Sequence, residues 1–111
     1  MAANRKELSD ILKSVMAEFG EEPHLYFQPP ESVKLQYPCI IYHLRTATTR
    51  NANDQPYFKT IGYDVTYITR DPDNKVWEKL ASLPKFGFDR YYTADGLHHY
   101  AFTSTDVMKE N

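Results

Sequence analysis

The clearest structural pattern in the sequence is Tyr57-Phe-Lys-Thr-Ile-Gly-Tyr-Asp-Val-Thr-Tyr-Ile-Thr69. From Ile61 to Tyr67, every second side chain is aliphatic or aromatic, and the positions between are short or polar. A period of two is the pattern of a strand that has one face against a core and the other in solvent. Residues 57–69 are therefore predicted to form a long, half-buried β-strand.

A second strand is predicted just before it, over residues 39–50, which read Cys39-Ile-Ile-Tyr-His-Leu-Arg-Thr-Ala-Thr-Thr-Arg50. Its first half is apolar without a break, as expected of a strand buried on both faces. Asn51 to Pro56 has the composition of a turn, so the two strands should form an antiparallel hairpin. At ~3.3 Å per residue each arm would be about 40 Å long, whereas a domain of this size is roughly 30–35 Å across. Part of the hairpin should project beyond the core.

The N-terminal segment is predicted to form an amphipathic helix over residues 4–19, and Gly20 is placed to end it. Its apolar positions fall on one face at the helical period. They are Leu8, Ile11, Leu12, Val15, Met16 and Phe19. Residues 24–28 form a short strand candidate, and residues 29–38, with proline at both ends, form an extended connector.

The C-terminal half is predicted to hold a helix and a second hairpin. Asp71 can cap a helix that starts at Pro72 and runs to Leu83. The hairpin joins strands 86–93 and 97–103 through the turn sequence Thr93-Ala-Asp-Gly96. The polar residues 104–111 are expected to form a frayed tail.

These elements predict an α+β fold. The 111 residues form one domain with a mostly antiparallel sheet, two helices packed on one face and a long projecting β-hairpin.

The composition excludes several function classes. Only 4 Gly are present, so a glycine-rich phosphate loop is not available, and one cysteine, Cys39, excludes an intrachain disulfide framework. The formal net charge of −2 gives no basic excess for general nucleic-acid binding. The polar start, Met1 to Ser9, is unlike a signal peptide, and the apolar runs are too short to span a membrane. A soluble intracellular protein is expected.

Candidate catalytic and metal-ligating residues do not converge in the sequence. His98 and His99 would point to opposite faces of a strand, so they cannot chelate one ion locally; His24 and His43 have no spacing that links them to either. Cys39 opens a buried strand, which favours a packed thiol over a nucleophile. We expect no catalytic, cofactor-binding or metal site, and no enzymatic activity.

Two further charged sets have alternative interpretations. Asp64 with the Asp89-Arg90 pair could form an acid–base set, although a cross-strand ion pair on a solvated face is favoured. Tyr91-Tyr92 could stack on single-stranded nucleic acid beside Arg45, Arg50 and Lys59, although these basic residues are widely spaced.

The hairpin tip is the best candidate interaction site. Residues 32–59 are net basic, whereas 1–31 and 60–111 are net acidic, as an electrostatically paired assembly surface would require. The residues expected to contact a partner or a neighbouring subunit are Arg45, Arg50, Asn53, Asp54, Tyr57 and Lys59.

Over residues 37–103, the sequence resembles a family of small structural proteins of long-tailed bacteriophages, known as minor capsid or tail-completion proteins. The resemblance is carried by four segments. They are Tyr37-Pro-Cys-Ile-Ile-Tyr42, Asn51-Ala-Asn-Asp-Gln-Pro-Tyr57, Tyr63-Asp-Val-Thr-Tyr67 with Thr69-Arg-Asp-Pro-Asp73, and Phe86-Gly-Phe-Asp-Arg-Tyr-Tyr-Thr-Ala-Asp-Gly-Leu-His-His99.

This resemblance implies a tail terminator, located in the virion at the head–tail junction and assembled in the host cytoplasm. Such proteins form a ring, typically a hexamer, at the head-proximal end of the tail tube, where they stop tube polymerisation and provide the head-joining surface. The implied partners are further copies of the chain, the tail-tube protein and a head-completion or connector protein, without a membrane, a specific nucleic acid or a cofactor. A head-completion protein (stopper or connector) of the same module is one alternative, and a nucleic-acid-binding accessory protein is another.

Overall fold

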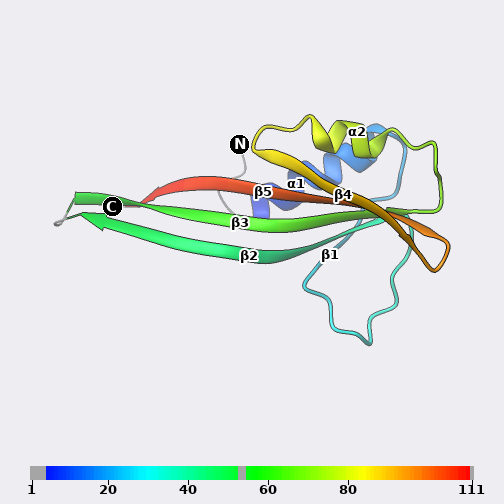
Figure 1. Cartoon of the computed structure of the whole chain (residues 1–111), viewed down its shortest axis with the longest axis horizontal. Coiled ribbons are helices and arrows are strands. Elements are labelled where there is room, and N and C mark those ends of the chain that lie inside the picture. Colours follow the sequence, from blue (N-terminus) through cyan, green and yellow to red (C-terminus); the bar gives the residue numbers. More distant parts are fainter. Residues whose placement is uncertain (1–4, 53–54, 111) are drawn as a thin grey trace.

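The helices and strands follow one another in the predicted order (Figure 1). The structure is a computed structural model that describes residues 5–52 and 55–110, with side-chain environments for 5–47 and 60–105. The elements are α1 (Arg5–Glu18), β1 (His24–Phe27), β2 (Cys39–Ala52), β3 (Gln55–Thr69), α2 (Val76–Ala81), β4 (Phe86–Ala94) and β5 (Leu97–Glu110).

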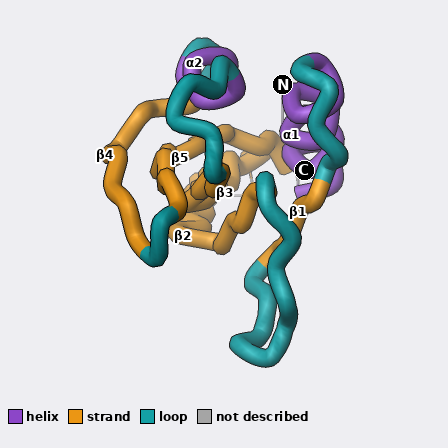
Figure 2. The backbone as a smooth tube through the Cα atoms, turned by 90° about the vertical axis from the view of Figure 1, so that its right-hand side faces the viewer, coloured by secondary structure: helices purple, strands orange, loops and turns teal. Residues whose placement is uncertain are grey.

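The strands form a five-stranded sheet in the order β1-β2-β3-β5-β4. β1 pairs with β2 in parallel, and the other neighbours pair antiparallel. Both helices lie on the same face of the sheet (Figures 1 and 2). The predicted α+β architecture is confirmed, including its mostly antiparallel sheet.

The main core lies between the two helices and the sheet. The alternation in β3 turns Val65 and Tyr67 toward the helices, where both are fully buried, while Asp64, just before Val65, points to the other face and is exposed. The buried members of this core are Leu8, Leu12, Val15, Met16, Ile40, Tyr42, Val65, Tyr67, Val76, Leu80, Tyr100 and Phe102. Around Asp64 the strand is therefore half-buried, as predicted, whereas near its end Ile68 on the opposite face is also buried, in a second cluster with Cys39 and Leu97.

The end of α1 has the geometry predicted for Gly20. This glycine has a φ of 75°, the left-handed conformation that lacks a steric penalty when there is no Cβ. The backbone N–H of Glu21 donates to the Met16 carbonyl at 3.0 Å, and that of Gly20 donates to the Ala17 carbonyl at 3.0 Å. This pair of bonds is a Schellman motif, which satisfies carbonyls that the helix end leaves free.

The start of α2 was predicted incorrectly. The helix begins at Val76, not at Pro72, because Asp71 uses its carboxylate to close a local turn by accepting the Asp73 N–H at 2.9 Å. The buried Asn74 accepts the backbone N–H of Trp77 at 3.1 Å instead. Asp, Asn and proline favour turns as well as helix starts, so the sequence signal was ambiguous.

The tail predicted over residues 104–111 is also corrected. β5 runs to Glu110, and residues 104–110 pair with β3 from Tyr63 back to Tyr57. Residue 111 lies outside the described part. Backbone pairing needs no apolar side chains, so a polar segment can form a strand where a neighbouring strand is there to pair with it.

The turn between β4 and β5 has the predicted form. Asp95 and Gly96 have φ angles of 54° and 75° between the paired residues Ala94 and Leu97. Two consecutive positive φ angles define the two-residue turn that matches the twist of a hairpin.

Replacing Leu12 with alanine should destabilise the fold by about 2–5 kcal/mol, because its fully buried side chain would leave a cavity between α1 and the sheet. Urea denaturation measures this change. The matched control is Lys13→Ala on the exposed side of the same helix, expected within about 0.5 kcal/mol of the original chain. Equal effects of the two substitutions would contradict the packing described.

Candidate functional site

A three-stranded extension of the sheet is the first candidate site. β1 pairs with β2 over Cys39–Tyr42, and β4 pairs with β5 as far as Ser104. Beyond these partners, β2, β3 and β5 continue together as residues 46–52, 55–62 and 105–110, which we call the arm. The arm extends past both helices in Figure 1. It accounts for a long axis of 52 Å and a radius of gyration of 15.3 Å, above the ~13 Å of a compact domain of this length.

The structure places three of the predicted contact residues on the arm. In its ladder, Arg50 is paired with Phe58, Lys59 with Thr49, and Tyr57 with Glu110. The side chains of Arg50, Tyr57 and Lys59 lie outside the part for which environments are described, and Asn53 and Asp54 lie outside the described residues altogether. Backbone pairing thus brings the three positions to the same end of the molecule.

Arg45, the fourth of the predicted contact residues with a described position, makes contacts within its own sheet. Its Nε lies 3.4 Å from Oδ1 of Asp64 on β3. Its Nη2 donates to the Ser104 carbonyl at 3.2 Å and to Oγ1 of Thr105 at 3.0 Å, both on β5. The side chain is 35% exposed. Arg45 therefore lies across the sheet and joins its three central strands at the base of the arm.

This crossing depends on Gly62. Arg45 is the extra residue at an irregularity in the β2–β3 ladder, between the pairs Leu44–Tyr63 and Thr46–Gly62. A Cβ built on Gly62 would collide with the guanidinium of Arg45 and lie 2.8 Å from Cγ2 of Thr46. The glycine lets the arginine lie flat on β3. A glycine inside an alternating strand often marks such a close approach, so Gly62 is the sequence signal for this contact.

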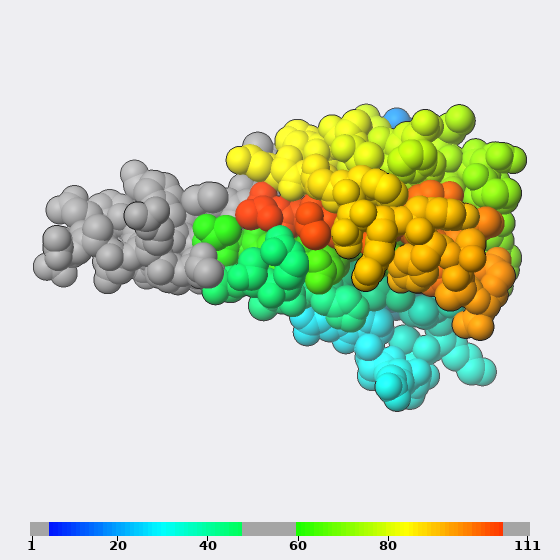
Figure 3. Space-filling model, in the orientation of Figure 1, coloured from blue at the N-terminus to red at the C-terminus, as the bar shows by residue number. Residues whose placement is uncertain are grey.

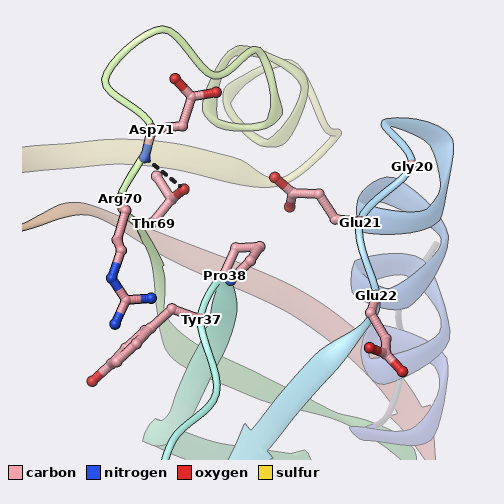
Figure 4. Close-up of a pocket in the computed structure, with 8 residues that line it drawn as sticks. All are labelled: Gly20, Glu21, Glu22, Tyr37, Pro38, Thr69, Arg70 and Asp71. Carbon is pink, nitrogen blue, oxygen red and sulfur yellow. Dashed lines mark hydrogen bonds between the residues drawn. The ribbon is translucent and has the colours of Figure 1, made fainter.

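The second candidate site is a pocket of about 430 Å³ at the end of the molecule remote from the arm. Figure 4 shows Glu21 reaching from the end of α1 toward the end of β3, and Arg70 beside the ring of Tyr37. The Arg70 guanidinium carbon is 5.2 Å from the centre of that ring. The residues that line the pocket are Gly20, Glu21, Glu22, Tyr37, Pro38, Thr69, Arg70 and Asp71.

Glu21 connects α1 to the sheet in this pocket. The hydroxyl of Tyr67 lies 2.9 Å and 2.7 Å from the two carboxylate oxygens of Glu21 and donates to them. Burial raises the pKa of Glu21, the Tyr67 hydrogen bond lowers it, and the negative charge of Asp71 raises it, with a net upward shift. Burial and the bond to Glu21 also raise the pKa of Tyr67. The pair holds the end of α1 on β3, and no spacing in the sequence links these two residues.

The remaining candidates are distributed over separate places. Cys39 is fully buried, and burial raises the pKa of its thiol to about 12, as a packed rather than a nucleophilic cysteine requires. Asp64 forms the cross-strand ion pair that was favoured, but with Arg45 rather than with the Asp89-Arg90 pair. Within residues 5–52 and 55–110, the structure holds no group of three His, Cys, Asp or Glu residues that could bind a metal ion.

The histidines of β5 stack on tyrosines of β4. Tyr91 and His98 have ring centres 5.9 Å apart and an oxygen-to-Nδ1 distance of 2.7 Å, while Tyr92 and His99 have ring centres 4.7 Å apart. Two strands, β3 and β5, separate Tyr91 and Tyr92 from Arg45. The structure therefore does not assemble the proposed nucleic-acid contact around Arg45.

Comparison with known proteins gives no family assignment: no family model matches the chain, and no curated protein matches it. Among the described residues, no helix is long and apolar enough to cross a membrane.

Replacing Gly62 with alanine should destabilise the protein by about 1–3 kcal/mol, because the new methyl group occupies the path of Arg45. Combining it with Arg45→Ala should cost less than the sum of the two single changes, because the main clash is then gone while that with Thr46 remains. Urea denaturation of the four proteins measures this coupling. Strict additivity would contradict the crossing.

Replacing Glu21 with glutamine should change how stability depends on pH. The raised pKa means that Glu21 favours folding below its ordinary value of 4.5, and this contribution is lost as pH rises through the raised value. Between about pH 4 and about pH 7, the stability of the original chain relative to Glu21→Gln should therefore fall as pH rises. Urea unfolding across this range tests the slope, with Glu31→Gln, the same change at an exposed position outside the pocket, as the control.

Proposed function

We propose that this protein is a non-enzymatic structural component of a long-tailed bacteriophage, a tail terminator that assembles as a ring at the head-proximal end of the tail tube. The observation that carries the proposal is the arm, in which three strands continue beyond the helix-covered core. The core does not need this extension for its own burial. A projection of this kind is suited to contact a neighbouring subunit.

The arm favours assembly into a ring because it would contact a different surface on the neighbouring copy. Contacts between two unlike surfaces repeat from copy to copy and close into a ring when the rotation allows it. Arg45 strengthens the base of the arm by joining β2, β3 and β5. The β2 and β3 parts of the arm also bear Arg50 and Lys59, whereas residues 1–31, which lie outside the arm, are net acidic. Opposite charges on the two surfaces would direct one copy onto the next.

The ring would stop growth of the tail tube and then provide the surface for a head-completion or connector protein. Its expected neighbours are thus further copies of the chain, typically six in a ring, the tail-tube protein and the head-side protein. In this proposal its location is the virion, and no cofactor takes part.

A phage from which this gene is deleted tests the proposal. Tails of uncontrolled length, seen by negative-stain electron microscopy, are the expected result, because tube polymerisation would lack its stop. Tails of normal length beside unjoined heads would overturn the terminator role and favour the head-completion alternative. Binding of single-stranded DNA that weakens steeply with salt would instead favour the accessory role.

The arm variant Arg50→Glu/Lys59→Glu should fail to restore normal tail length in the deletion phage, because it reverses the charge of the contact surface. Its stability should stay close to that of the original chain, since the core lies elsewhere. Complementation by Lys13→Ala, on the exposed side of α1, provides the control. Full complementation by the arm variant would show that these charges do not make the contact.

A further inference from the structure

The outer edge of β4 lacks a partner strand in the described part of the chain. β4 is the last strand in the sheet order, and Figure 2 shows nothing beside it on its outer side. An edge strand presents unpaired backbone N–H and C=O groups, which can bind another strand. β4 has nine residues, Phe86–Ala94, so this edge is long enough for several such bonds.

The side chains of this edge are unusually apolar for a free surface. Phe88, Tyr91 and Tyr92 are 46%, 49% and 42% exposed and are among the few large exposed apolar residues of the described chain. In the space-filling view, β4 forms an open surface beside β5 (Figure 3). Exposed aromatic side chains are enriched at protein–protein interfaces.

An irregularity at the centre of β4 makes the strand symmetric about that point: side chains at equal distances on either side of it lie on the same face of the sheet. Phe88 pairs with Phe102 and Arg90 with Ala101, so Asp89 is an extra residue. At such a bulge two residues oppose one and point to the same side. Asp89 and Arg90 therefore share the face away from the helices, and their charged groups lie 3.9 Å apart.

The residues on either side of the bulge lie on matching faces of the sheet. Phe88 and Tyr91 both lie on the helix side, where Phe88 contacts Trp77 and Tyr91 contacts Tyr100. Next to them, Gly87 and Tyr92 lie on the opposite side, near Thr103 and His99. Going outward from the bulge in either direction, the side chains therefore alternate between the two faces of the sheet in the same sequence. A strand without a bulge cannot have this symmetry, because its neighbouring residues, such as 89 and 90, would lie on opposite faces.

We propose that β4 pairs antiparallel with β4 of a second copy of this chain, about a two-fold axis at the bulge. Asp89 then lies opposite Arg90 of the second copy, and the reverse pair forms at the same time. The flanking pairs are Phe88 with Tyr91, Gly87 with Tyr92, and Phe86 with Thr93, each formed twice.

The composition of these pairs identifies a second copy as the occupant. The two Asp–Arg pairs neutralise each other across the axis, whereas a repeated like charge would repel. Phe88 and Tyr91 would bury their exposed rings together on one face. Tyr92 would cover Gly87, which has no side chain of its own to pack. The edge is complementary to itself, as a two-fold contact requires. It does not use the arm, so this inference does not rest on the proposed ring.

Charge exchange on the purified full chain tests the contact. Sedimentation equilibrium should show a dimer whose dissociation constant rises by at least about tenfold in Asp89→Arg and in Arg90→Asp, because each change places like charges opposite each other. The double variant Asp89→Arg/Arg90→Asp restores the complementarity and should return to within about threefold of the original value. Asp73→Arg, an exposed change of the same size in net charge, should leave the constant unchanged.

Cross-linking tests the register. Gly87→Cys and Tyr92→Cys proteins should form a disulfide when mixed under mild oxidation, and several-fold less when each is oxidised alone. Residue 87 tolerates a Cβ, since the nearest atom would be 3.4 Å away. Circular dichroism establishes that each variant is folded.

A chain that stays monomeric at high concentration would overturn the inference, whatever other partner β4 has. Folded single-charge variants that dimerise as tightly as the original chain would also overturn it. So would a double variant that dimerises as weakly as the single ones, or equal cross-linking in the mixture and in each protein oxidised alone.

Discussion

The difference in length between the helices and the strands determines most of this structure. α1 has 14 residues and α2 has 6, which correspond to about 21 Å and about 9 Å of helix. β3 has 15 residues, about 50 Å of strand. The helices can therefore cover one end of the sheet only. The buried aromatic and aliphatic residues gather under them, and the remaining strands must be stable by backbone pairing and by contacts such as that of Arg45.

The sequence predicted those parts of the fold that follow from a local period or a strong turn signal. The alternation around Val65, the helical face around Leu12 and the Asp95-Gly96 turn all led to the correct elements. The start of α2 was missed because Asp71 favours a turn as strongly as a cap. The strand at 104–110 was missed because its pairing with β3 is long-range and needs no apolar pattern.

The candidate site was less predictable because its contacts depend on register. The sequence placed Arg45 in the interaction set, but its bonds to β5 join residues that are about 60 positions apart. They form because a ladder irregularity turns the side chain across Gly62. Likewise, the pairing of Glu21 with Tyr67 depends on where α1 ends relative to β3. A single sequence shows which residues are unusual, whereas only the packed sheet shows which of them meet.

The burial of Cys39 has a practical consequence for any study of this chain. It is the single cysteine of the sequence, it lies at the start of β2 in a small buried cluster with Ile68 and Leu97, and its thiol is fully shielded with a pKa of about 12. A thiol reagent can modify it only after the sheet opens around it, since the reactive thiolate is both inaccessible and scarce. The rate of thiol labelling in native buffer therefore reports how often the strands around Cys39 open, without an engineered probe.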